Sequence, residues 1–161
     1  MGKEIERKFL VDTDAYKSLA EGVYYHQGYL CAEAERTVRV RIAGDTAFMT
    51  VKGPTVGASR PEFEYEIPFE EAEEILNDLC LRPTIEKHRY KLPWAGFLWE
   101  IDEFHGDNKG LVVAEIELPA EDTEFEKPNW IGAEVTGDPK YYNASLISYP
   151  FKDWPTEAEK K

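Results

Sequence analysis

The chain has 161 residues, of which 42% are hydrophobic, so it is long enough for one domain with a substantial core. Its 32 acidic residues exceed its 19 basic residues and give a net charge of −13. This composition excludes a disordered chain, and the charge argues against nucleic acid or anionic membranes as partners because their phosphates would be repelled.

The same sequence indicates a protein of a reducing compartment. No apolar run approaches the length of a membrane span, and the charged start MGKEIERK does not resemble a signal peptide. Cys31 and Cys80 are far apart and match no metal or redox spacing, which predicts two small hydrophobic side chains. We therefore expect a cytoplasmic protein, and a homodimer is compatible with the sequence.

Strand signals dominate the first half of the chain. Residues 3–11 alternate charged and apolar side chains, which predicts a strand, and residues 13–20 predict a short helix. Residues 23–32 are rich in aromatic and β-branched side chains, which predicts a second strand. Residues 36–43 and 46–53 predict a hairpin because a Gly-Asp turn separates them.

The second half contains the clearest helix signal. After a loop at 53–61 and a strand at 62–67, the apolar side chains of residues 69–81 follow a helical period. A shorter helix is predicted at 139–148. Three further strands are predicted at 84–92, 97–104 and 111–118.

These elements predict a mainly β protein of the α+β type. Eight strands with few helices favour an eight-stranded antiparallel sheet closed into a barrel, with the helices packed outside. The helix at 139–148 is expected near one mouth of this barrel. Residues 1–150 are interpreted as one domain and residues 151–161 as a flexible tail.

Charged side chains recur at every second position in seven of the eight predicted strands. On a single strand this pattern is typical of a solvated face with cross-strand ion pairs. Solvated faces also contain Ser, Thr, Asn and Gln, whereas these faces hold almost only carboxylate, guanidinium and ammonium groups. The alternative is a barrel with charges inside and apolar faces packed outward. Because buried charges are costly unless they are paired or bind a ligand, this alternative implies a binding site.

The lining predicted in this way is close to neutral. If its acids and bases separate, the acidic part suits hard divalent cations, which bind carboxylate oxygens. The basic part suits a polyanion, because arginine and lysine bind phosphate oxygens. The basic set is Lys8, Arg39, Arg41, Lys52, Lys87 and Arg89. The acidic set is Glu4, Glu6, Glu62, Glu64, Asp102, Glu115 and Glu117.

The segment EIERK at residues 4–8 resembles the ExExK signature of the CYTH superfamily, the triphosphate tunnel metalloenzymes. One ExExK is a weak signal, but further segments fit the same family in order along nearly the whole chain. These are RVR at 39–41, TVK ending at Lys52, RPEFE at 60–64, KHR at 87–89, EID at 100–102 and EIE at 115–117. Among family members, the chain most resembles the short bacterial inorganic tripolyphosphatases.

The resemblance implies an eight-stranded tunnel that hydrolyses tripolyphosphate to diphosphate and phosphate, with two Mg²⁺ or Mn²⁺ ions. The implied metal ligands are Glu4, Glu6, Asp102, Glu115 and Glu117. The implied phosphate-binding residues are Lys8, Arg39, Arg41, Lys52, Lys87 and Arg89. The residues implied to act at the reacting atoms are Lys8, Tyr29, Glu62, Glu64 and Lys87.

Other functions remain compatible with the same residues. Adenylyl cyclase, thiamine triphosphatase and nucleoside triphosphatase chemistry would need a pocket for a base or thiazolium beside the phosphates. A non-catalytic sensor of polyphosphate or nucleotide would not need the carboxylates, and a purely structural barrel would bind no ligand. His26, His88 and His105 share no ligand spacing, so none is interpreted as a metal ligand.

Overall fold

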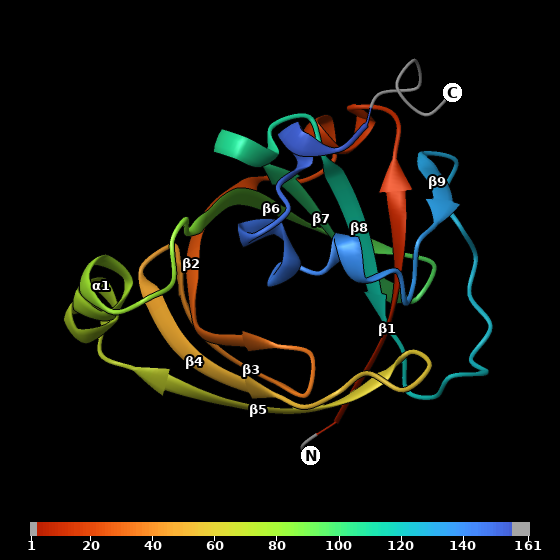
Figure 1. The fold of residues 1–161 in the computed structure, drawn as a ribbon. Helices are drawn as coiled ribbons and strands as arrows, with labels where there is room; N and C mark the ends of the chain where they lie inside the picture. Colours follow the sequence, from red (N-terminus) through yellow and green to blue (C-terminus); the bar gives the residue numbers. More distant parts are fainter. Residues whose placement is uncertain (1–2, 156–161) are drawn as a thin grey trace.

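The computed structural model describes residues 3–155 of the chain, and Figure 1 shows their arrangement as a ring of strands. The strands are β1 (Lys3–Val11), β2 (Gly22–Glu33), β3 (Arg36–Ala43), β4 (Thr46–Lys52), β5 (Ser59–Ile67), β6 (Ile85–Trp94), β7 (Phe97–Phe104), β8 (Val112–Glu117) and β9 (Ile131–Glu134). The α-helix α1 spans Phe69–Asp78, and the 3₁₀ turns are η1 (Ala15–Ser18), η2 (Gly106–Asn108), η3 (Pro139–Tyr141), η4 (Ser145–Ile147) and η5 (Phe151–Asp153).

The sheet closes on itself through β1. The strand order is β5-β4-β3-β2-β6-β7-β8-β1-β9, and an additional pairing of β5 with β1 completes a ring of eight antiparallel strands. Residues 3–5 of β1 pair with β5, and residues 6–10 pair with β8. The predicted closed barrel is confirmed, and β9, which the sequence did not predict, adds a short strand beside the end of β1.

The main hydrophobic cores lie outside the barrel wall. Phe9 of β1, Trp99 of β7 and Ile116 of β8 are fully buried in one cluster. A second cluster forms where Ala72 and Leu76 of α1 pack against the outer side of β3 and β4. Apolar side chains therefore face outward into covering segments, which leaves the alternate positions of each strand facing the interior.

The helix α1 approaches β2 closely enough to require a glycine there. A Cβ atom on Gly28 would lie 2.9 Å from the side chain of Cys80, which follows α1. The helix ends at Asp78, three residues earlier than predicted, and Leu79 beyond it is 66% exposed. The Cys80 N–H donates to the Ile75 carbonyl, five residues earlier, which closes the last turn and ends the helical backbone there.

The C-terminal segment differs from the predicted helix at 139–148. It forms the turns η3 and η4, with extended backbone at Tyr142 between them. Tyr141 and Leu146 both enter an apolar cluster at one end of the barrel interior, against Ile85 and Phe104. These two side chains are five positions apart, and an α-helix would direct them to different sides, so the segment bends instead.

The start and end of the chain also differ in detail from the sequence prediction. The helix predicted at 13–20 is the single turn η1, whose Tyr16 is buried. The predicted tail begins with residues that pack: the Phe151 N–H donates to Asn108 Oδ1 at 2.8 Å, and Trp154 stacks edge-on against Tyr141. The remainder of the predicted tail, residues 156–161, lies outside the described residues.

Candidate active site

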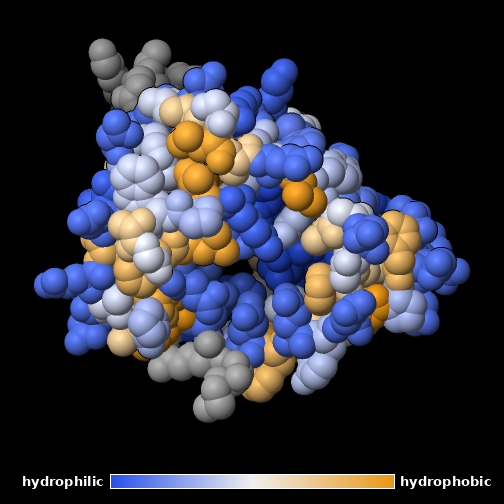
Figure 2. Space-filling view, turned by 180° about the vertical axis from the view of Figure 1, so that it is seen from behind, coloured by the Kyte–Doolittle hydropathy of each residue, from blue (hydrophilic) through white to orange (hydrophobic). Residues whose placement is uncertain are grey.

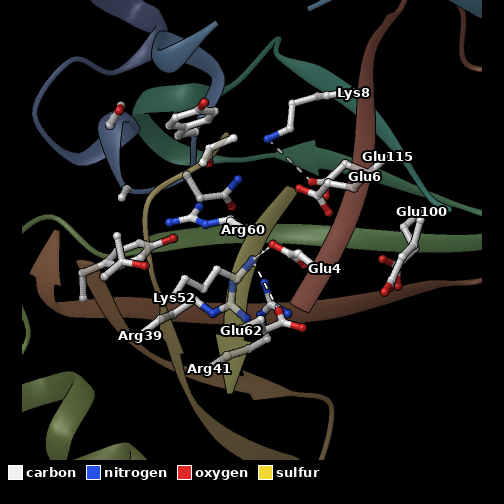
Figure 3. Close-up of a pocket in the computed structure, with 18 of the residues that line it drawn as sticks. Glu4, Glu6, Lys8, Arg39, Arg41, Lys52, Arg60, Glu62, Glu100 and Glu115 are labelled. Atoms are coloured by element: carbon white, nitrogen blue, oxygen red, sulfur yellow. Dashed lines mark hydrogen bonds and ion pairs between the residues drawn. The ribbon is translucent and has the colours of Figure 1, made fainter. Parts of the chain in front are cut away.

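The barrel encloses a cavity of about 810 Å³. Figure 2 shows a hollow surrounded by hydrophilic side chains, and Figure 3 shows charged side chains pointing into it from several strands. Its wall contains Tyr29 and twelve other residues that the sequence placed in the site. These are Glu4, Glu6, Lys8, Arg39, Arg41, Lys52, Glu62, Glu64, Lys87, Arg89, Glu115 and Glu117.

Basic side chains gather on the wall formed by β2, β3 and β6. Arg41 Nε donates to Gln27 Oε1 at 2.8 Å. The ring of Tyr25 lies between two guanidinium groups, 5.1 Å from Arg41 and 5.0 Å from Arg89. Burial, together with the charges of Arg39 and Arg89, lowers the pKa of Arg41 to about 9.

Asp102 lies behind this basic wall and does not line the cavity. Its Oδ2 accepts from Lys87 Nζ at 2.7 Å, and its Oδ1 accepts from Arg89 Nε at 2.7 Å. Burial alone would raise the pKa of Asp102, but Arg89 and Lys87 outweigh burial and lower it to about 2. The sequence grouped Asp102 with the metal ligands, whereas the structure makes it a counterion shared by two cations.

The four cations of the basic wall pair with three carboxylates: Asp102 with Lys87 and Arg89, Glu100 with Arg89 at 3.5 Å, and Glu64 with Arg39 at 3.6 Å. Burial lowers the pKa of Lys87 well below its ordinary value. Asp102 acts in the opposite direction, and repulsion from Arg89 and Arg41 offsets part of its effect. Asn143 Oδ1 accepts from Lys87 Nζ at 2.9 Å without adding negative charge. Bound anions would compensate this excess, so this part of the cavity is suited to a polyanion.

Carboxylates gather on the opposite wall, where β1 and β8 are paired. Glu6 lies opposite Glu117 in the strand register, and Glu115 lies opposite Lys8. Burial raises the pKa of Glu6 well above its ordinary value, and the neighbouring Glu115 and Glu4 raise it further. This mutual repulsion means that a cation would be stabilised here.

Two lysines form ion pairs with carboxylates of the cavity. Lys52 Nζ lies 2.6 Å from Glu4 Oε1 and 3.5 Å from Glu62 Oε2, across the seam between β1 and β5 (Figure 3). Lys8 Nζ lies 3.9 Å from Glu115 Oε1 and donates to the Tyr141 carbonyl at 3.3 Å. Both ammonium groups therefore lie among carboxylates of the cavity wall.

The carboxylate wall has the donor chemistry of a site for a hard divalent cation. Carboxylate oxygens are the ligands that Mg²⁺ and Mn²⁺ prefer. Within residues 3–155, no three His, Cys, Asp or Glu side chains are already arranged around one metal position. Glu4 Oε1 accepts from Lys52 Nζ at 2.6 Å, so a metal bound through Glu4 would use its other oxygen or share the carboxylate with Lys52.

Sequence reasoning missed several residues of the cavity wall. Arg60 of β5 and Glu100 of β7 line it (Figure 3). Both lie two residues from a charge that was selected on the same strand, so the two-residue period could have indicated them. Arg60 is fixed by donating from Nη2 to the Gly53 carbonyl at 2.8 Å. Asn143 also lines the cavity. It lies outside the strands, so the two-residue period of charges does not indicate it, and tertiary packing brings its segment into the interior.

Fold and site together define a class of protein: a closed antiparallel barrel whose interior separates acidic from basic side chains. The CYTH domain family matches residues 2–146. The chain belongs to this family. No helix of the described residues is long and apolar enough to cross a membrane.

Two relatives match nearly the whole chain. An inorganic triphosphatase of Acetivibrio thermocellus is 58% identical over 154 residues, which are 96% of this chain and 99% of that protein. An inorganic triphosphatase of Nitrosomonas europaea is 40% identical over 153 residues, covering 91% of this chain and 99% of that protein.

Solved structures agree with the fold. The crystal structure of an inorganic triphosphatase, 33% identical, has a TM-score of 0.62 and covers 91% of this chain and 95% of its own. A protein from Pyrococcus horikoshii, 16% identical with a TM-score of 0.54, covers 97% of this chain and 93% of its own. The second similarity supports the fold alone.

Proposed function

We propose that this protein is an inorganic triphosphatase that hydrolyses tripolyphosphate to diphosphate and phosphate with the help of divalent metal ions. The observation that carries the proposal is the separation of charge within one cavity, with carboxylates on β1 and β8 facing guanidinium and ammonium groups on β3 and β6. The names of the relatives that match over nearly the full chain support the same reaction.

In this proposal the basic wall binds the substrate chain. Arg39 and Arg89 are buried and Arg41 is half-buried, which restricts their guanidinium groups and suits the paired oxygens of a phosphate. Lys87 is oriented by Asp102 and Asn143. Lys8 and Lys52 supply point charges between this wall and the carboxylates.

The acidic wall would hold the metal ions. Glu4, Glu6, Glu115 and Glu117 are the proposed ligands, and Mg²⁺ or Mn²⁺ are the ions that fit their oxygens. When bound, such ions neutralise phosphate charge and stabilise the oxygens that attack and leave. Asp102 is assigned here to orienting Lys87 and Arg89, because its oxygens accept from those side chains.

The remaining residues would act near the attacking water. Glu62 and Glu64 lie on β5, where Lys52 and Arg39 hold them at 3.5 Å and 3.6 Å. We assign them to orienting the water that adds to the terminal phosphorus, as the bond to the bridging oxygen breaks and diphosphate leaves. Tyr29, buried in the cavity wall, would donate its hydroxyl to a phosphate oxygen.

The test is phosphate release from tripolyphosphate with Mg²⁺, compared with ATP and thiamine triphosphate. We expect rapid turnover of tripolyphosphate, weak turnover of the others, and loss of activity with EDTA or with Glu117→Gln. Glu73→Gln on the exposed face of α1 is the matched control and should be fully active. Metal-dependent binding of tripolyphosphate without turnover would contradict the proposed enzymatic activity and support a sensor. Faster turnover of ATP than of tripolyphosphate would support nucleotide chemistry.

A further inference from the structure

All three histidines of the chain lie on one part of the outer barrel wall, where β2, β6 and β7 are neighbours. His26 of β2 is the cross-strand partner of Glu86 on β6, and His88 of β6 is the partner of Glu103 on β7. His105 follows β7, and its backbone N–H donates to the backbone carbonyl of Glu86 at 3.0 Å. Strand register thus brings together side chains that are far apart in the sequence.

Two of these imidazoles already share a hydrogen bond. His88 Nδ1 and His105 Nε2 are 2.7 Å apart, with the ring planes at 81° and the ring centroids 4.9 Å apart. One nitrogen donates and the other accepts, so both are directed at the same point between the rings. Both side chains are partly exposed, which leaves this point accessible from the outer surface.

A metal ion can replace the hydrogen between two such nitrogens after a small movement. With Zn–N bonds of about 2.0–2.1 Å in tetrahedral geometry, two ligand nitrogens lie about 3.3 Å apart. Starting from 2.7 Å, the two nitrogens would have to separate by about 0.6 Å. Imidazole is a good ligand for Zn²⁺, Ni²⁺ and Cu²⁺ and a poor one for Mg²⁺.

We propose that His88 and His105 form a binding site for a transition metal ion such as Zn²⁺ on the outer barrel wall. The protein supplies two preformed nitrogen ligands, and water completes the coordination. Two carboxylates on the same wall are already engaged: Glu103, the cross-strand partner of His88, pairs with Lys17, and Glu86 accepts a hydrogen bond from the Tyr24 hydroxyl. Within the described residues no preformed set of three ligands exists, so binding weaker than at a structural zinc site is expected.

This site is separate from the carboxylate wall inside the barrel. His88 alternates along β6 with Lys87 and Arg89, which face the interior, so its side chain lies on the opposite side of the sheet. The ligand types also differ: nitrogen outside, oxygen inside. The inference therefore does not depend on the triphosphatase proposal.

The test is isothermal titration of the full chain with Zn²⁺ in a large excess of Mg²⁺, which occupies the carboxylates. We expect the wild type to bind one Zn²⁺ per chain that His88→Gln and His105→Gln do not bind. His26→Gln is the matched control, because His26 lies on the same wall but its Nε2 is bonded to Thr84 Oγ1 at 2.8 Å. It should bind Zn²⁺ as the wild type does.

A second readout identifies the ligands directly. Electron paramagnetic resonance with Cu²⁺ should show coupling to two nitrogens in the wild type and lose it in both variants. Unchanged circular dichroism and unchanged tripolyphosphate hydrolysis would establish that the variants fold. A wild type that binds no Zn²⁺ in excess Mg²⁺, or variants that bind as much as the wild type, would overturn the proposal.

Discussion

At the residue scale, Asp102 explains how the barrel accommodates several buried cations. Its carboxylate is 2% exposed and bonds to both Lys87 and Arg89, so one negative charge orients two positive side chains toward the cavity. Such a buried arrangement costs desolvation and is tolerated only while its partners are complete. The consequence is that changes at this residue affect stability as well as substrate binding.

Asp102→Asn preserves the shape of the side chain but removes the shared charge. We expect the free energy of unfolding to fall by about 3–5 kcal/mol, because two buried cations lose their counterion. Urea denaturation followed by circular dichroism measures this change. Asp107→Asn, at a carboxylate that pairs with Lys152 on the surface, should cost less than about 1 kcal/mol, and equal losses in the two variants would contradict the prediction.

The same residue predicts a pH dependence. The pKa of Asp102, lowered to about 2 in the fold, lies below the value of about 3.9 expected for an unfolded chain. A carboxyl of this kind stabilises the fold above its unfolded pKa and loses that contribution as pH falls through the folded pKa. The stability difference between wild type and Asp102→Asn should therefore stay constant from about pH 7 to 5 and shrink between about pH 4 and 2. Urea titrations at each pH would show this, and a constant difference down to pH 2 would refute it.

Glu6 illustrates the opposite situation, a carboxylate among other carboxylates. Because Glu115 and Glu4 repel its charge, Glu6→Gln should raise the melting temperature, Tm, of the metal-free protein. The same variant should lose most of the rise in Tm that Mg²⁺ produces in the wild type, and most of the activity. Differential scanning calorimetry in EDTA tests the expected rise in Tm, and calorimetry with Mg²⁺ tests the expected loss of metal stabilisation. A variant that is less stable in EDTA yet still stabilised by Mg²⁺ would contradict the proposed metal wall.

At the element scale, the C-terminal segment decides which end of the barrel interior is filled. Tyr141 and Leu146 occupy the apolar end formed by β6, β7 and β8, and Asn143 reaches Gln27 and Lys87 beside it. The blue segment in Figure 1 lies across the interior accordingly. The same element therefore packs part of the core and orients a lysine of the cavity.

Leu146→Ala removes a fully buried side chain from this segment. We expect a loss of about 2–5 kcal/mol in the free energy of unfolding, because a cavity remains where the side chain was. The turnover number should also fall, since Asn143 and Lys87 lose their support. Leu79→Ala is the control, because Leu79 is 66% exposed and its loss should cost less than about 0.5 kcal/mol. Denaturant unfolding and steady-state kinetics of both variants decide between these outcomes.

At the scale of the whole molecule, charge is distributed very unevenly. The chain has a net charge of −13, yet one wall gathers four cations against three carboxylate partners. The cations are Arg39, Arg41, Lys87 and Arg89, and the partners are Glu64, Glu100 and Asp102. A barrel with internal ion pairs alone would not need this excess. The field inside the cavity therefore favours a polyanion even though the molecule as a whole repels one.

This distribution predicts that tripolyphosphate binds without metal. In EDTA, tripolyphosphate at about 100 times its Kd should stabilise the fold by about 2.7 kcal/mol, seen as a rise in Tm. Sulfate at the same ionic strength is the control and should produce a much smaller rise. Equal effects of the two anions would indicate general screening, and no rise with tripolyphosphate would indicate a purely structural barrel.

The sequence by itself determined the barrel and the composition of its interior. Period-two alternation decides which side chains of a strand share a face, so Glu4 and Glu6 share one face of their strand and Arg39 and Arg41 share one face of theirs. The almost purely charged composition of these faces predicts that they line the interior. The same local rule predicted the outward packing of α1, because a helical period of apolar residues needs an apolar surface to cover. These features depend on neighbours within a few positions of the chain.

The tertiary structure alone decided which of these residues meet. Register between strands pairs Asp102 with Lys87 and Arg89, and it places His88 against His105. Strand pairing joins residues that are distant in the chain, and a shift by one residue would reverse every face, so spacing in the sequence cannot specify such partners. The bend of the C-terminal segment was decided in the same way, because burying both Tyr141 and Leu146 in one apolar cluster outweighs the local preference for a helix.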